Sequence, residues 1–229
     1  MSREFRRLAM KEFKHLPGLD LIRVFGILVV VFYHYQVETA VRGLCPADFL
    51  PAMEPLVQVA VYTMTLLSGS CLCWQEKSRS WSMKRYLWGR FLAIYPLFWL
   101  CFFPIFIYSD IICGNNEGVA PWKLLLSIVG VDGYFQSFTP TFYKIGEWYL
   151  GCILFLYAVF PVLWRMIRRR GVVFAAVGAL FAWLACCFVE NPGQLYPTLI
   201  GQLPLFFMGI FLGGCLPSLW IPGILAGMT

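Results

Sequence analysis

Long uncharged runs of apolar residues, each bounded by charged side chains, limit most strongly what this chain can fold into. Four runs of 17 to 21 residues occupy 55–75, 91–109, 148–164 and 171–189. A helix needs about 20 residues to cross the ~30 Å hydrocarbon core of a bilayer. Because the runs are continuous and do not alternate polar with apolar residues, they exclude a lipid-facing β-barrel. They predict an all-α, polytopic membrane helix bundle.

Two further segments bring the predicted bundle to six spans. The run at 191–229 is long enough to span but contains five prolines. The first run, 24–37, reaches spanning length only if Arg23 and His34 lie within the membrane or at its edge. We interpret 1–229 as a single membrane domain. Because its last apolar stretch is too short to span, we expect the sequence to continue beyond Thr229.

The composition excludes other classes of protein. Hydrophobic residues make up 60% of the chain and charged residues 13%. A soluble domain is nearer half apolar and a quarter charged, so a soluble globular protein is excluded. The aromatic content of 18% excludes a disordered chain. The net charge of +6 does not by itself indicate nucleic acid, and we expect no nucleic-acid partner.

The basic residues predict the orientation in the membrane. Fifteen of the 18 Lys and Arg residues lie in three segments: Arg3, Arg6, Arg7, Lys11, Lys14 and Arg23; Lys77, Arg79, Lys84, Arg85 and Arg90; and Arg165, Arg168, Arg169 and Arg170. Cytoplasmic loops of membrane proteins carry an excess of Lys and Arg. All three segments lie inside if the N-terminus does. We therefore predict a multi-pass protein whose N-terminus is cytoplasmic.

Residues 110–147 form a long outer segment. Its uncharged stretches are too short to cross the membrane, and Asp132-Gly133 is a turn signal. We predict an interfacial or re-entrant half-helix at 121–131.

Most of the nine cysteines lie inside apolar spans, where they behave as small hydrophobic residues. Cys45 and Cys113 lie in outer segments and could pair, although two free thiols are the favoured interpretation. Cys71 and Cys73 lack a second cysteine pair and a histidine, so no metal site is predicted.

The first span carries the strongest functional signal. Ionisable residues in a membrane helix are costly and are functional candidates by default. The step from Arg23 to His34 turns a helix by ~1100°, which leaves the two only ~20° apart and ~16 Å along the axis. Asp20 and Glu38 extend the same stripe. The stripe indicates a polar cavity, or else a snorkelling Arg23, a His34 among the headgroups and a solvated Glu38.

Five other residues leave two interpretations open. Ser68 and Gly69 serve close helix packing or make room for a ligand. Arg85 and Arg90 are topology signals or bind phosphates. Glu147 is a solvated rim residue or a group of an outward-facing site.

The order of these elements resembles the integral-membrane acyltransferase family 3, whose members O-acylate carbohydrates and other cell-envelope molecules. Arg23 and His34 match the spacing of an arginine, ten residues and a histidine in its first span. The other matching elements are Leu67-Ser68-Gly69, Arg90 with Ile94-Tyr95-Pro96, Trp148-Tyr149-Leu150 with Tyr157 and Phe160-Pro161, and the stretch from Leu203-Pro204 to Gly209. Together they extend over about 200 residues.

Two positions depart from the family pattern. The family often has a second arginine three residues after the first, where this chain has Ala93, and a glutamate five residues after the tryptophan, where it has Ile153. No role is therefore transferred to Glu147. The family usually has about ten spans, which is more than the six found here.

The resemblance implies an O-acetyltransferase of a bacterial cytoplasmic membrane. An acyl-CoA, usually acetyl-CoA, enters from the cytoplasm as a donor substrate, and a hydroxyl of a cell-surface polysaccharide or glycolipid is the acceptor. Acyl transfer needs a base, and a buried imidazole such as His34 tends to stay neutral and able to accept the proton. Arg23, Arg85 and Arg90 are the candidates for the donor's phosphates, and Ser68 and Gly69 line the approach.

Two rival classes stay open. A carrier or flippase for an envelope precursor would use the same polar stripe to pass a solute. A scaffold for an envelope-assembly complex would use the stripe only for helix packing. Transport without a CoA donor would favour the first rival, and indifference to substitution of Arg23 and His34 would favour the second.

Overall fold

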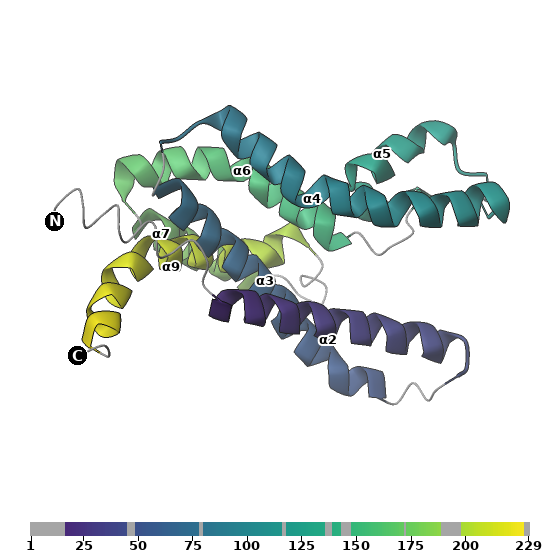
Figure 1. Cartoon of the computed structure of the whole chain (residues 1–229), viewed down its shortest axis with the longest axis horizontal. Helices are drawn as coiled ribbons and strands as arrows, with labels where there is room; N and C mark the ends of the chain where they lie inside the picture. Colours follow the sequence, from purple (N-terminus) through teal and green to yellow (C-terminus); the bar gives the residue numbers. More distant parts are fainter. Residues whose placement is uncertain are drawn as a thin grey trace. The chain divides into compact units, whose positions relative to one another are not determined.

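The computed structural model describes residues 17–44, 49–77, 80–115, 118–135, 139–142, 148–171, 173–188 and 198–226. Within these ranges the regular elements are helices, and no strand occurs. The long helices are α2 (Pro17–Val41), α3 (Leu50–Lys77), α4 (Met83–Phe106), α6 (Trp148–Arg170), α7 (Val173–Cys187) and α9 (Leu199–Ala226) (Figure 1). The short elements are the π-helical turn η2 (Ile107–Ile112), the 3-10 turns η3 (Pro121–Lys123) and η4 (Asp132–Tyr134), and α5 (Leu124–Val129).

Four helical segments in the described ranges are long and apolar enough to cross a membrane. They are Gly18–Val41, Leu50–Lys77, Met83–Ile112 and Trp148–Arg170. Two shorter apolar helices, Val173–Cys187 and Leu199–Cys215, lie where the remaining spans were predicted. The prediction of an all-α, polytopic membrane helix bundle is confirmed.

The chain forms two compact units, and each is described by itself. The first, here called the α2–α3 unit, comprises Met1–Arg79, Val172–Leu184 and Pro204–Thr229. The second, the α4–α6 unit, comprises Ser80–Gly171 and Ala185–Leu203.

In the α2–α3 unit, α2 packs lengthwise on α3 (Figure 1). Val29 of α2 is buried with Val57 and Ala60 of α3. A Cβ atom on Gly26 would lie 2.9 Å from Cε of Met64, so a side chain there would require the flexible end of Met64 to shift. The contact lies one turn beyond Arg23 and places the predicted first-span residues against α3.

Helix α9 also packs on α3, and it does so through small residues. Gly209 and Gly213 lie so close to the α3 backbone that neither has room for a Cβ atom. The Ser70 hydroxyl donates to the Gly209 carbonyl at 2.8 Å, and Lys77 Nζ donates to the Gly214 carbonyl at 2.6 Å. Two glycines four residues apart are typical of tightly packed membrane helices.

In the α4–α6 unit, the predicted half-helix at 121–131 is present as η3 followed by α5. It ends at Gly130, which adopts the left-handed conformation with φ of 79° that favours glycine at a helix C-terminus. Two α4 side chains hold it: the Tyr95 hydroxyl donates to the Val129 carbonyl at 3.0 Å, and Trp99 Nε1 donates to the Ile128 carbonyl at 2.9 Å. Helix α5 therefore lies alongside α4 (Figure 1).

Candidate functional site

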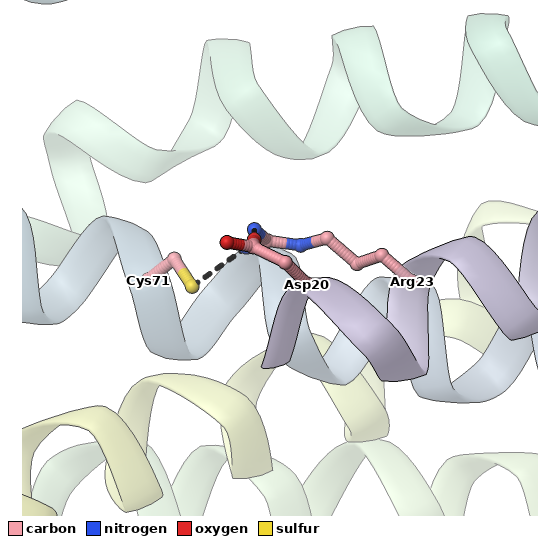
Figure 2. Close-up of polar contacts among 3 residues, drawn as sticks. All are labelled: Asp20, Arg23 and Cys71. Carbon is pink, nitrogen blue, oxygen red and sulfur yellow. Dashed lines mark hydrogen bonds and ion pairs between the residues drawn. The ribbon is translucent and has the colours of Figure 1, made fainter. Parts of the chain in front are cut away.

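The Arg23 guanidinium is held in place by two neighbours, one on its own helix and one on α3. Nη1 donates to Oδ1 of Asp20 at 2.9 Å, and Nη2 lies 2.8 Å from Sγ of Cys71 (Figure 2). The Arg23 and Asp20 side chains are 38% and 52% exposed. A guanidinium has five N–H donors, so an oriented and partly exposed Arg23 retains donors for an anionic ligand.

His34 lies on the same unbroken helix as Arg23. The eleven-residue step places the two Cα atoms ~16 Å apart along the axis and ~20° apart around it. The imidazole is exposed in the described part of the chain, so the expectation of a buried His34 is wrong. Its ring meets the Tyr33 ring edge-to-face at 5.9 Å between centroids. The structure therefore keeps Arg23 and His34 on one side of α2, as the spacing predicts.

Glu38 pairs locally and does not reach the rest of the stripe. Its Oε1 lies 2.6 Å from Nη2 of Arg42, and the two side chains are 59% and 67% exposed. This agrees with the interpretation of Glu38 as a solvated residue. The stripe thus carries one ion pair at each end, with His34 between them.

Gly69 lies where α9 presses on α3. A Cβ atom there would lie 3.1 Å from the Ile210 nitrogen and closer still to the Phe206 carbonyl. The geometry gives Gly69 a packing role, which was one of the two interpretations of the small residues. Whether Ser68 and Gly69 also line the approach of a donor stays a prediction.

Arg85 and Arg90 belong to the α4–α6 unit. Arg85 Nη2 donates to the Ser80 carbonyl, and the Arg90 guanidinium carbon lies 5.4 Å from the centroid of the Tyr157 ring, which is cation–π distance. The Tyr86 hydroxyl donates to the Tyr157 carbonyl at 2.7 Å. The structure therefore joins Arg90 to α6 through Tyr157, and both arginines remain partly exposed.

Two acidic residues of the α4–α6 unit that were not among the candidates are buried, Asp110 and Asp132. Asp132, read only as part of a turn, is fully buried together with Ser127. Burial raises the pKa of the Asp132 carboxyl, because desolvation disfavours its charged form. The available signal was an acidic residue between two uncharged stretches.

Two outer-side predictions fall partly beyond what the structure describes. Glu147 and Cys45 lie outside the described residues. Cys113 is exposed and carries a free thiol.

Comparison with known proteins decides the family. A family model described as an acyltransferase domain matches residues 16–217. The chain belongs to acyltransferase family 3. The match includes every residue of the predicted site. This family member is also similar to "Acyltransferase MdmB" of Streptomyces mycarofaciens, with 26% identity over 191 residues that cover 77% of this chain and 47% of that protein. The chain spans about half the length of this curated relative. No solved structure matches.

Proposed function

We propose that this member of acyltransferase family 3 is a membrane O-acyltransferase. It moves an acyl group, specifically acetyl, from acyl-CoA to a hydroxyl of a cell-surface polysaccharide or glycolipid. The observation that carries the proposal is that α2 presents an oriented guanidinium, Arg23, and an imidazole, His34, on the same side of the helix. Family membership and the similarity to an acyltransferase support it.

The donor binds through its phosphates. A guanidinium matches phosphate geometry with two parallel N–H groups, which a lysine does not provide. Asp20 and Cys71 restrict the Arg23 side chain, so less conformational freedom is lost when a phosphate binds. Arg85 and Arg90 are further cations from a basic segment predicted to be cytoplasmic, the side on which acyl-CoA is available.

His34 acts as the general base. As the acceptor hydroxyl oxygen attacks the thioester carbonyl carbon, the imidazole takes the hydroxyl proton. The tetrahedral intermediate then collapses, its carbon–sulfur bond breaks, and the departing thiolate takes the proton back from the imidazole. The products are an ester and free CoA. The exposure of His34 on α2 suits an acceptor as bulky as a glycan.

We propose that the protein works in a bacterial cytoplasmic membrane, with the acceptor reached from the outer side. The distribution of basic residues supports this orientation.

The direct test supplies the purified protein in lipid nanodiscs with acetyl-CoA and envelope glycans. The proposal predicts one free CoA for each ester formed on the acceptor. Translocation of a glycolipid in proteoliposomes without a CoA donor, and with no ester formed, would instead identify a carrier or flippase.

A further inference from the structure

Four aromatic side chains of the α4–α6 unit cluster where α4 begins; we call Trp81, Tyr86, Phe160 and Trp164 the aromatic cluster. The Trp81 ring lies 5.5 Å from Tyr86 and 6.3 Å from Trp164 between centroids. Phe160 stacks on Tyr86 at 5.5 Å and on Trp164 at 6.0 Å. Three of the rings are buried, whereas Trp81 is partly exposed. The cluster is therefore an accessible indole supported by a stack of buried rings.

A buried hydrogen-bond donor lies in the same cluster. Trp164 is 5% exposed, and its Nε1 has no hydrogen-bond partner in the part of the chain that the structure describes. Buried donors are nearly always paired in folded proteins. An interfacial belt of aromatic residues explains an exposed Trp81, but it does not explain this unpaired N–H. A ligand that offers an acceptor atom does.

Each of the two helices that form the aromatic cluster carries an exposed basic residue within one turn of it in the sequence. Lys84 is exposed on the first turn of α4, and Arg168 is exposed one turn after Trp164 on α6. The N-cap of α4, Ser82, makes no side-chain hydrogen bond to the helix. The first amides of α4 thus add to a positive environment that suits an anion.

We propose that the aromatic cluster binds the nucleotide end of the acyl donor. The adenine ring stacks on Trp81, and the ribose 3′-phosphate lies near Lys84 and the first amides of α4. This assignment rests on the proposed function for the identity of its ligand. Flat heteroaromatic bases stack on tryptophan, and phosphates bind lysine and helix N-termini. The segment belongs to the loop predicted to face the cytoplasm, from which such a donor comes.

The experiment measures binding of adenosine 3′,5′-bisphosphate to the whole protein in nanodiscs by calorimetry. This probe has the base and phosphates of CoA but no thioester. Trp81→Ala removes the stacking surface and should weaken binding about tenfold, whereas Trp81→Phe should retain most of it. Lys84→Ala leaves the rings in place and should also weaken binding. Trp88→Ala, at an exposed tryptophan of α4, is the matched control and should bind as wild type.

The outcomes separate this inference from the proposed function. Failure of the probe to bind the wild type, or equal affinity in Trp81→Ala, Lys84→Ala and Trp88→Ala, would overturn the aromatic cluster as a nucleotide site. Binding that depends on Trp81 in a protein that transfers no acyl group would uphold the cluster and overturn the acyltransferase. Thermal unfolding of each variant shows whether it folds. If Trp81→Ala does not fold, the binding affinities of Trp81→Phe and Lys84→Ala decide: the site requires near wild-type binding by the first and weakened binding by the second.

Discussion

The carboxylate of Asp20, which lies one turn before Arg23 on α2, accepts a hydrogen bond from the Arg23 guanidinium at 2.9 Å. Both side chains are partly exposed, so the pair adds little to stability. Its effect lies in orientation, because it restricts the side chain that the proposed function assigns to the donor's phosphates.

Asp20→Asn should therefore impair donor use more than folding. We expect the KM for acetyl-CoA to rise about fivefold, with little change in kcat, because a hydrogen bond to a charged group is worth roughly 1 kcal/mol or more. Glu38→Gln breaks the equivalent ion pair at the other end of α2 and should leave KM unchanged. Equal effects of the two substitutions would show that Asp20 serves only the helix.

The reactivity of the Cys71 thiol measures whether a donor is bound at Arg23. Its thiol contacts the Arg23 guanidinium and is partly exposed, so a donor bound at Arg23 should shield it. Saturating acetyl-CoA should slow maleimide labelling of Cys71 about tenfold or more, as measured by peptide mass spectrometry. Exposed Cys113 should label at the same rate with and without donor. Unchanged labelling of Cys71 at saturation would place the donor elsewhere.

The contact between α9 and α3 should govern the stability of the α2–α3 unit. Gly209→Ala and Gly213→Ala each insert a Cβ atom into the α3 backbone, and we expect each to cost roughly 1–3 kcal/mol. Gly89→Ala is the matched control, because a Cβ atom there meets nothing within 4 Å. It should be neutral or slightly stabilising, since alanine favours a helix. Thermal unfolding in detergent compares the three, and a tolerated Gly209→Ala would contradict this contact.

The helices were predictable from the sequence because apolar runs report membrane spans directly. Helices α2, α3 and α6 extend beyond their runs, whereas α7 is shorter than the run 171–189. Helix α2 covers Pro17–Val41, whereas the first uncharged run is 24–37. The added turns carry charges that pair locally, Asp20 with Arg23, and Glu38 with Arg42 just after the helix ends. A rule that ends a span at each charge therefore shortens the helix.

Contacts between distant segments were not predictable in this way. The small residues Ser68 and Gly69 indicated close packing as one interpretation, but not that α9 is the partner of Gly69. Asp132 appeared to mark an exposed turn because Gly follows it, whereas η4 packs so closely on Trp148 that the carboxyl is fully buried. The contact between Arg23 and Cys71 likewise depends on how α2 is aligned along α3, which the sequence does not show.

Asp132 should give the stability of the protein a dependence on pH. Burial raises the pKa of its carboxyl in the folded state, so the folded chain binds more protons than the unfolded chain above the ordinary carboxyl pKa. The free energy of unfolding should therefore fall as pH rises from that ordinary value through the raised one. Asp132→Asn should remove this fall. The melting temperature of Asp132→Asn minus that of wild type should therefore be higher at pH 7.5 than at pH 4.

Glu54→Gln, at an exposed carboxylate, is the control and should follow wild type at both pH values. If Asp132→Asn and wild type differ in melting temperature by the same amount at pH 4 and at pH 7.5, the Asp132 carboxyl titrates as an ordinary one.

The central claim is that α2 carries a donor-binding guanidinium and a catalytic imidazole as separate functions. The most direct test measures acyl transfer and acetyl-CoA binding side by side in His34→Ala, with Tyr35→Phe as an exposed neighbouring control. Loss of a general base typically reduces a rate by about 10²–10⁴-fold, so His34→Ala should lose transfer to that extent while the Kd for acetyl-CoA stays within about twofold of wild type. Transfer by His34→Ala at the wild-type rate would contradict the account.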